Sequence, residues 1–361
     1  PPNRGRLGAR GQAGMQLLYD PDRLKHPLIR VGARGEGRWR EATWDEALDR
    51  VAAGLRESLE QNGPGAIAYF PHGIATYYFK RLMRRLGVYH HASPSFGQCR
   101  GPRDVGYKLT FGMTPGSPER LDFEHAEAIF LLGSHLGENI HTSQVLEFSR
   151  ALQRGAKLIV VDPRYSVAAD KAQLWLPIRP GTDLALLLAL IRYLIVEGLY
   201  DEEQVARYCV AFAELQRAVA HATPEWAAEI TDLPVEKIVA TARTLGEARP
   251  RTVIHPGRFT SWHGNDTQRS RALAILTALL GAWGRAGGIF LPSPLRLGPP
   301  CCSPQPAGKT PSPRPPFSTE GEPFQDIVRA SLADGKEGIK LWFLYGSNLL
   351  QSMPDQSRTI E

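Results

Sequence analysis

Blocks of apolar and polar residues follow one another along the chain in a pattern that predicts alternating strands and helices. Short apolar runs at 66–70, 127–132, 157–161, 174–178 and 252–255 predict strands. Longer runs at 43–59, 75–86, 143–154, 183–197 and 267–283 predict helices, and short helices are expected over 202–246. This alternation favours an α/β fold with doubly wound, mostly parallel sheets.

Two further stretches complete the pattern. Thr43 is expected to cap a helix in which Ala47, Leu48, Val51, Leu55 and Leu59 form one apolar stripe. The proline-rich stretch 291–316 predicts a connector, after which 324–332 predicts a helix and 339–345 a strand.

Composition narrows the function classes. The net charge is +6 without a long basic run, which indicates anionic ligands and no nucleic acid. The four cysteines, Cys99, Cys209, Cys301 and Cys302, form no C-x-x-C, so neither a zinc site nor a disulfide framework is indicated. The most apolar stretch, 184–196, is too short to cross a bilayer.

Cys99 stands where a loop rich in proline and glycine gives way to a predicted helix over 102–111. A thiolate there would be stabilised by the positive end of the helix dipole and by Arg100 and Arg103. Cys99 is therefore a candidate nucleophile, redox thiol or soft-metal ligand, and an inert buried cysteine is the alternative.

Polar motifs follow four of the predicted strands, at the edge where open α/β sheets bind ligands. They are 133–139, 162–164, 179–183 and 255–258. Glycines there let the backbone approach a pyrophosphate, an aspartate can take a ribose hydroxyl, and Asp183 can accept two N–H bonds from a guanine edge. No standard dinucleotide or P-loop motif is present, and each motif alone also fits a turn with a helix cap.

These motifs, in this order, resemble the molybdopterin oxidoreductase family, the dimethyl sulfoxide reductase superfamily. The resemblance is carried by 20–24, 43–47, 133–139, 161–164, 178–183, 272–289 and 345–348. It implies molybdenum or tungsten held by two molybdopterin guanine dinucleotides, with Cys99 as the protein ligand. Phe96 to Pro102 looks closest to the catalytic subunits of polysulfide and thiosulfate reductases.

The resemblance also assigns roles to single residues. Residues expected to contact one guanine dinucleotide are Gly133, Glu138, Asn139, Asp162, Arg164, Arg179, Gly181 and Asp183. Gly346 and Asn348 would serve the other dinucleotide. Arg258 is a candidate cation that steers an anionic sulfur substrate, with a cofactor-phosphate contact or a solvent-facing arginine as the alternatives.

By this resemblance the chain is organised as two interleaved α/β domains. We expect a remnant of an iron–sulfur region and connector at 1–42, and the first part of an α/β domain carrying Cys99 at 43–112. An inserted Rossmann-like dinucleotide-binding domain is expected at 113–290, a linker at 291–320, and a truncated return to the first domain at 321–361. Relatives carry a four-iron, four-sulfur cluster, but Gly8 stands at a cysteine position, so this chain does not support one.

The expected function is reduction of polysulfide, thiosulfate or tetrathionate by part of a catalytic subunit. Arsenate reductase, formate dehydrogenase and an inactive nucleotide-binding remnant are the alternatives. Arg100 speaks against formate dehydrogenases, which usually carry histidine directly after the ligand. The implied partners are an iron–sulfur electron-transfer subunit and a quinol-oxidising membrane anchor, and the implied location is the periplasm or the outer face of the cytoplasmic membrane. Both ends of the chain are expected to be cuts through a longer protein.

Overall fold

The computed structural model describes most of the chain. The described residues are 5, 7–72, 76–88, 90–92, 100–116, 119–134, 136, 144–257, 264–291, 331–332, 338–352 and 355–361. Cys99, Glu138, Asn139 and Arg258 lie outside them. The chain divides into unit 1, Pro1–Ala13 with Gln98–Arg296, and unit 2, Gly14–Gly97 with Leu297–Glu361.

Unit 1 is built on a four-stranded parallel sheet. Its strands are β5 (Ala128–Leu132), β6 (Lys157–Val161), β7 (Leu174–Leu176) and β8 (Thr252–Ile254). Their order is β7-β6-β5-β8, and every neighbouring pair is parallel. The chain leaves β5 in one direction towards β6 and β7 and returns on the other side as β8. The strand order therefore reverses between β5 and β8, which is where doubly wound folds bind ligands.

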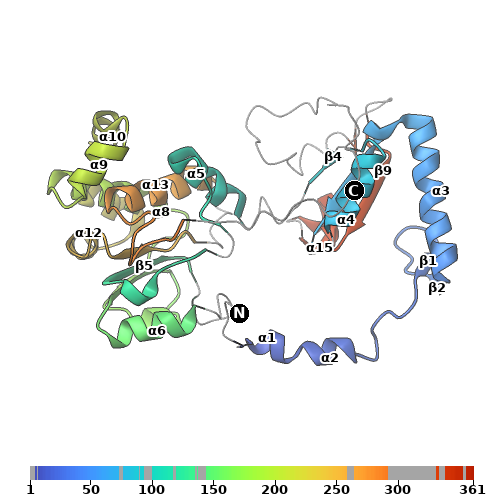
Figure 1. Ribbon diagram of the computed structural model, residues 1–361, viewed down its shortest axis with the longest axis horizontal. Helices are drawn as coiled ribbons and strands as arrows, with labels where there is room; N and C mark the ends of the chain where they lie inside the picture. Colours follow the sequence, from blue (N-terminus) through green and yellow to red (C-terminus); the bar gives the residue numbers. More distant parts are fainter. Residues whose placement is uncertain are drawn as a thin grey trace. The chain divides into compact units, whose positions relative to one another are not determined.

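Helices cover both faces of this sheet (Figure 1). One face packs on α8 (Asp183–Val196), α12 (Val235–Glu247) and α13 (Asp266–Leu279), and the other on η3 (Phe123–His125), α6 (Val145–Gln153) and α7 (Val167–Asp170). Phe130 and Leu132 point to the first layer, whereas Ile129 and Leu131 point to the second. This alternation buries both faces and confirms the predicted doubly wound sheet.

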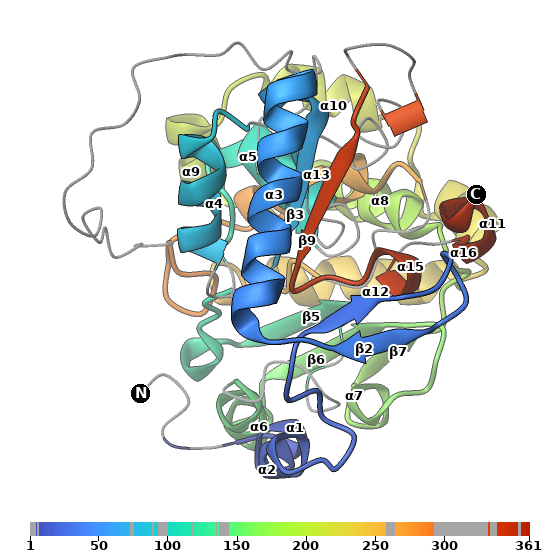
Figure 2. The same cartoon turned by 90° about the vertical axis from the view of Figure 1, so that its right-hand side faces the viewer.

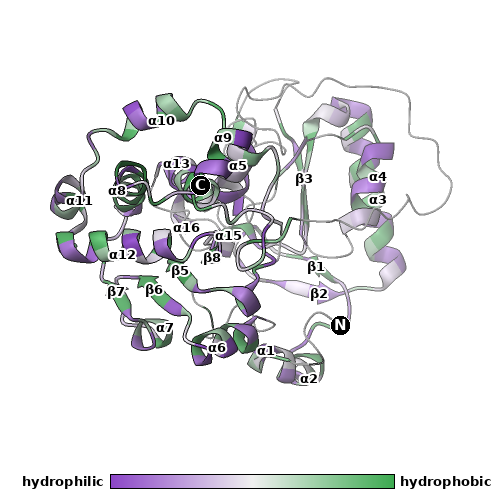
Figure 3. Cartoon of the chain, turned by 60° about the vertical axis from the view of Figure 1, so that its left-hand side comes forward, coloured by the Kyte–Doolittle hydropathy of each residue, from purple (hydrophilic) through white to green (hydrophobic). Residues whose placement is uncertain are grey.

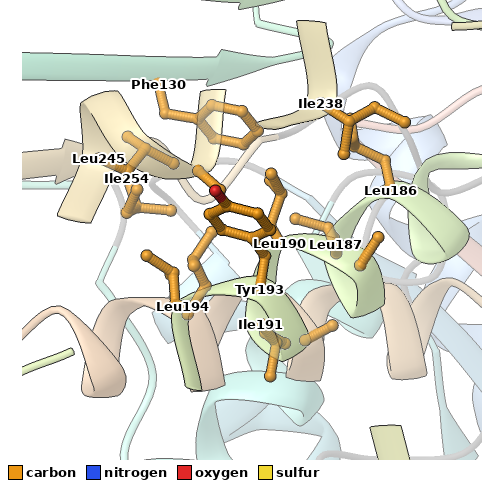
Figure 4. Close-up of a cluster of buried hydrophobic side chains, with 14 of the residues drawn as sticks. Phe130, Leu186, Leu187, Leu190, Ile191, Tyr193, Leu194, Ile238, Leu245 and Ile254 are labelled. Atoms are coloured by element: carbon orange, nitrogen blue, oxygen red, sulfur yellow. The ribbon is translucent and has the colours of Figure 1, made fainter. Parts of the chain in front are cut away.

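The larger core lies under α8, a helix that is apolar around most of its circumference. Figure 4 shows side chains of β5, β8, α8 and α12 gathered in this core, and Figure 3 shows α8 mostly in the hydrophobic colour. Leu186, Leu187, Leu190 and Leu194 are all fully buried. A helix with apolar residues all round has to be enclosed, which is why α10 (Phe212–Val219) and α11 (Pro224–Thr231) pack outside it, whereas α9 (Glu202–Tyr208) packs against α13.

Unit 2 contains a three-stranded parallel sheet assembled from distant parts of the sequence. Its order is β4-β3-β9, with β3 (Ile67–Pro71), β4 (His90–His91) and β9 (Leu341–Tyr345). Strands β3 and β9, blue and red in Figure 2, pair along their whole length. The helices α3 (Trp44–Asn62) and α4 (Thr76–Arg85) belong to the same unit.

One predicted boundary differs from the observed division. The prediction placed 43–112 in one domain, whereas α5 (Gly101–Phe111) belongs to unit 1. The reason is packing: a Cβ on Gly106 would lie 2.6 Å from the backbone nitrogen of Arg271, so α5 and α13 touch at the backbone. The observed division falls at Gly97 and Gln98.

The predicted apolar stripe on α3 is only partly buried. Thr43 caps the helix as expected, and its hydroxyl accepts the N–H of Glu46 at 3.2 Å. Leu55 is buried, but Leu48 is 59% and Val51 43% exposed. Periodicity identified the helix correctly and overstated how much of it is covered.

The remaining described elements are short. They are α1 (Ala9–Gln12), α2 (Gly14–Leu18), the hairpin β1 (Leu28–Arg30) and β2 (Trp39–Glu41), η1 (Pro64–Ala66), α15 (Leu349–Ser352) and α16 (Gln356–Ile360). Within the described residues, no helix combines the length and the apolar character needed to span a bilayer. Of the predicted helix over 324–332, all but residues 331 and 332 lie outside the described residues.

Candidate functional site

The carboxyl ends of the four strands of unit 1 bring several predicted site residues to one edge of the sheet. Gly133 follows β5, Asp162 follows β6, and the turn 179–183 leads from β7 into α8. The N–H of Gly133, which has a φ of 56°, donates to the carbonyl of Val161 at 3.0 Å, so the chain turns immediately after the strand. Because β5 and β6 are neighbours, Gly133 and Asp162 leave the sheet side by side.

A serine and a histidine join the ends of β5 and β8. The Ser134 hydroxyl lies 2.8 Å from Nδ1 of His255, and the N–H of Gly257 donates to the same nitrogen at 3.0 Å. A backbone N–H can only donate, so Nδ1 accepts both bonds, and a neutral ring then carries its proton on Nε2. Ser134 and His255 are both buried and hold the two loops together where the strand order reverses.

Asp162 is held in a fixed orientation. Its Oδ1 accepts the N–H of Arg164 at 2.8 Å, and its carbonyl accepts the indole N–H of Trp175 at 2.9 Å. The residue is 5% exposed. The Asp162 carboxylate is thus fixed at the carboxyl end of β6, and its predicted contact with a ribose hydroxyl stays a prediction.

The loop between β7 and α8 contains three predicted site residues. Arg179 forms two charge-assisted hydrogen bonds to Asp232, from Nε at 2.7 Å and from Nη2 at 2.6 Å. Gly181 has a φ of 85°, which this turn requires and which glycine adopts without strain. Asp183 is the first residue of α8 and is 8% exposed. Asp232, 53 residues from Arg179, was missed because nothing in the sequence marks it as a partner.

A second missed residue, Arg269, lies in the first turn of α13 and is 4% exposed. Its Nη2 reaches the Ser270 hydroxyl at 3.4 Å, and its Nε lies 3.9 Å from a carboxylate oxygen of Asp266. Within the described part of the chain, Nε and Nη1 have no hydrogen-bond acceptor. Burial lowers the pKa of Arg269, and the negative charges of Asp183 and Asp266 act in the opposite direction.

Two helices begin at this edge without a side-chain cap from the residue before them. Thr182 precedes α8, but its hydroxyl donates to the carbonyl of Arg179 at 2.7 Å instead of accepting a helix N–H. Asn265 precedes α13 and likewise makes no capping bond with its side chain. Amides in the first turn of a helix are donors for an anionic or polar ligand.

In unit 2, two predicted residues follow β9. Gly346 has a φ of 64°, and a Cβ there would collide with the carbonyl of His72. The Asn348 side chain accepts the N–H of Gln351 at 3.3 Å and so starts α15. Both residues thus serve the turn at the carboxyl end of β9.

Comparison with known proteins identifies the family. A family model described as molybdopterin oxidoreductase matches residues 23–361. The chain belongs to the molybdopterin oxidoreductase family. It is 33% identical to the thiosulfate reductase molybdopterin-containing subunit PhsA of Salmonella typhimurium over 80% of this chain and 38% of that protein. It is 31% identical to the dimethyl sulfoxide reductase DmsA of Escherichia coli over 77% of this chain and 38% of that protein.

A solved structure of this family agrees with the fold. Acetylene hydratase from Pelobacter acetylenicus superposes with a TM-score of 0.70 at 31% identity, covering 76% of this chain and 38% of the other. The chain therefore spans less than half the length of these relatives.

The family implies a molybdopterin cofactor, and the described residues at this edge suit a group that carries phosphate and polar ring atoms. Asp162 and Asp183 offer carboxylate acceptors. The two helix starts offer donors, and so does Arg269, whose Nε and Nη1 have no acceptor among the described residues. Among the residues with described positions, no group of three or more His, Cys, Asp or Glu side chains is placed to hold a metal ion. Cys99, the predicted metal ligand, lies outside those positions. Cys209 is described, and burial raises the pKa of its thiol, which disfavours a thiolate there.

Proposed function

We propose that this chain is part of the catalytic subunit of a molybdenum-dependent oxidoreductase that reduces an inorganic sulfur anion such as polysulfide, thiosulfate or tetrathionate. The observation that supports the proposal is the carboxyl edge of the unit 1 sheet, where Gly133, Asp162 and Asp183 follow the neighbouring strands β5, β6 and β7 in a chain of the molybdopterin oxidoreductase family. The choice of substrate rests on the similarity to a thiosulfate reductase subunit.

In this proposal each residue has a separate task. The backbone of Gly133 approaches the pyrophosphate, Asp162 accepts a ribose hydroxyl, and Asp183 accepts the N–H groups of guanine. Glu138, Asn139, Arg164, Arg179 and Gly181 complete the same dinucleotide site, with the guanidinium of Arg179 fixed by Asp232. Gly346 and Asn348 serve the second dinucleotide. When bound, a bis-molybdopterin guanine dinucleotide would supply a metal centre able to give two electrons to the substrate and to accept an oxygen or sulfur atom from it.

Two residues outside the described positions act on the metal and the substrate. Cys99 provides a thiolate, the ligand type that soft metal centres prefer, and Arg258 attracts the anionic substrate. Electrons come from an iron–sulfur partner subunit and a quinol-oxidising membrane anchor. We place the assembled protein at the periplasmic face of the membrane.

Other substrates of the family are kept as candidates because the relatives have similar identities. Acetylene hydratase of Syntrophotalea acetylenica is 33% identical, and a formate dehydrogenase subunit of Methanococcus maripaludis is 29% identical. Arsenate reduction is a further candidate. Turnover of tetrathionate, arsenate, formate and acetylene by the intact enzyme separates them, and rapid formate oxidation would contradict the sulfur-anion proposal.

The cofactor can be tested on the chain itself. We expect the chain, produced in a host that makes the cofactor, to carry molybdenum or tungsten and to release GMP on acid hydrolysis. Cys99→Ser should keep the GMP and alter or lose the metal, because in this proposal Cys99 binds the metal and other residues bind the nucleotide. Cys209→Ser, at a half-buried thiol of unit 1, is the matched control and should change neither.

Three outcomes are decisive. A chain without metal and without guanine would leave a nucleotide-binding remnant or an inert fragment as the better description. Guanine without metal would support the dinucleotide site alone. Wild-type metal content and spectrum in Cys99→Ser would contradict the role of Cys99.

A further inference from the structure

A buried group of charged side chains lies at the start of α5. Arg103 is 1% exposed, and the carboxylates of Asp104 and Glu119 are buried with it. The half-exposed Arg100 lies 3.6 Å from Asp104, so two guanidinium groups balance two carboxylates. A buried ion pair rarely stabilises a fold more than well-packed apolar residues of similar volume would. Stability alone therefore does not account for these charges.

All three nitrogens of the Arg103 guanidinium are engaged. Nε and Nη2 donate to Oδ1 of Asp104 at 3.0 and 2.7 Å. Nη2 also donates to the carbonyl of Gly116 at 3.1 Å, and Nη1 forms an ion pair with Glu119. Gly116 and Glu119 are themselves joined by an antiparallel bridge. The planar guanidinium thus fixes the first turn of α5 against this bridge.

The same bridge is joined to the start of α6. Gln144, the residue before α6, is buried, and its Nε2 donates to the carbonyl of Glu119 at 2.6 Å. Glu119 therefore contacts the starts of two helices. Its side chain contacts α5, and its backbone contacts α6.

These two helix starts are the described ends of two segments with proposed roles. α5 begins two residues after Cys99, and α6 begins directly after the stretch 133–144, which includes the predicted dinucleotide contacts. α5 lies beside α13 in Figure 1 and touches its backbone at Gly106. Because α5 is held at Gly106 and at Arg103, its first turn cannot rotate without breaking the bonds of the guanidinium.

We propose that Arg103 and Glu119 are positioning residues that hold the start of α5 in a fixed orientation relative to the start of α6, and so set Cys99 relative to the stretch 133–144. This inference rests on the proposed function, in which Cys99 binds the metal and that stretch binds a dinucleotide. Charge-assisted hydrogen bonds are directional and suit this role, whereas apolar side chains of similar volume could slide past one another.

The variant that separates position from stability replaces both members of the pair. Arg103→Met combined with Glu119→Met removes one positive and one negative charge, and Asp104 retains Arg100 as a partner. Replacing a buried ion pair by apolar residues is often neutral or stabilising. We therefore expect this double variant to fold, with a urea midpoint close to or above that of the wild type.

Amide hydrogen exchange of the full chain without cofactor measures how firmly the two helices are held. In the double variant, the amides of 105–111 in α5 and of 148–153 in α6 should exchange about fivefold or more faster than in the wild type, because both helices lose a common contact. The amides of α12, which packs against α8, should exchange at the wild-type rate.

The chain produced with cofactor gives the second measurement. The double variant should release as much GMP as the wild type, but the electron paramagnetic resonance spectrum of its metal should be shifted. Arg103→Lys should change the spectrum and the exchange less and in the same direction, because lysine keeps the charge without the planar fork. If the double variant does not fold, Arg103→Lys is tested by the same two measurements.

A matched control is the exposed ion pair of Arg251 and Glu127 in the same unit. Nη1 of Arg251 donates to Oε1 of Glu127 at 2.8 Å, and the two side chains are 59% and 54% exposed. Arg251→Met combined with Glu127→Met should retain the wild-type exchange of α5 and α6 and the wild-type metal spectrum.

The possible results separate this inference from the proposed function. A wild-type chain without metal and without guanine would contradict the proposed function, and the positioning of a metal ligand with it. If the wild type holds the metal, an unchanged spectrum in a folded variant of the pair would overturn the inference and leave the proposed function intact. Faster exchange in only one of the two helices, or equal changes in the control, would also overturn it, because the pair would then not be a specific link between α5 and α6.

Discussion

The two ends of the parallel sheet in unit 1 differ in how their polar groups are satisfied. At the amino end, the stretch 281–289 closes on itself: the N–H of Ile289 donates to Ala282 at 3.0 Å and that of Gly284 to Ile289 at 2.8 Å. The Asp122 carboxylate accepts the N–H of Gly287 at 3.0 Å. These polar groups at the amino end are therefore paired with one another within the chain.

The carboxyl end leaves comparable groups open. The starts of α8 and α13 lack side-chain caps from their preceding residues, and two guanidinium nitrogens of Arg269 have no acceptor among described atoms. Buried polar groups are nearly always paired in folded proteins. The difference teaches that the glycine-rich stretch 281–289, although it carried part of the family resemblance, closes the amino end with its own hydrogen bonds. It supports our proposal that the ligand binds at the opposite edge.

The largest effect on stability is expected from adding a side chain in the stretch 281–289 at the amino end of the sheet. A Cβ on Gly288 would lie 2.8 Å from the carbonyl carbon of Ala282 and closer still to its oxygen, and neither backbone atom can move aside. Gly288→Ala should lower the free energy of unfolding by about 3 kcal/mol, measured by urea titration. Gly155→Ala is the control, because Gly155 has a φ of 93° and open space around it, and should cost about 1 kcal/mol. Equal losses in the two variants would mean that the stretch 281–289 is not tightly closed.

An intermediate effect is expected at the buried Tyr107 of α5, the helix that packs on α13. Burial raises the pKa of Tyr107 to about 12 from 10.0. Between these values the unfolded chain has lost the proton and the folded chain keeps it, so stability present below pH 10 should decline towards pH 12. The loss should approach about 2–3 kcal/mol.

Tyr107→Phe isolates this contribution, because the other tyrosines are unchanged. Unfolding by urea at several pH values should show a weaker decline above pH 10 in the variant than in the wild type. Identical declines would show that Tyr107 ionises equally in both states and is not enclosed between α5 and α13.

The sequence allowed the sheet of unit 1 to be predicted because each strand is a short apolar run followed by a turn. Both faces of β5 are covered, so its residues are apolar without alternation, as buried parallel strands are. The predicted ends of the elements were less accurate. The strand predicted over 174–178 stops at Leu176, and the helix predicted over 267–283 stops at Leu279. In both cases the following residues are apolar but do not continue the hydrogen-bond pattern of the element. The exposed part of the α3 stripe shows the limit of periodicity, which identifies an apolar face without saying what covers it.

Site residues could be predicted from the sequence only where they directly follow a strand, because the order of the strands then determines where the residues lie. Gly133, Asp162 and Asp183 reach one edge because parallel strands place their carboxyl ends together. The pair formed by Ser134 and His255 spans 121 residues, and the pair formed by Arg179 and Asp232 spans 53, so neither has a local signal. Arg269 looks like an ordinary polar residue in the first turn of a helix until the packing of α13 buries it.

The smallest effect concerns helix starts at the carboxyl end, where α7 differs from α8. The Ser166 hydroxyl caps α7 by accepting the N–H of Ala169 at 3.2 Å, whereas Thr182 makes no such bond to α8. Ser166→Ala should cost about 1 kcal/mol of unfolding free energy and leave GDP affinity unchanged. Thr182→Ala should cost about 0.5 kcal/mol, because it removes only an exposed bond to the carbonyl of Arg179. A larger loss in Thr182→Ala would mean that Thr182 does cap α8 in solution, and the start of that helix would then be closed to a ligand by its own chain.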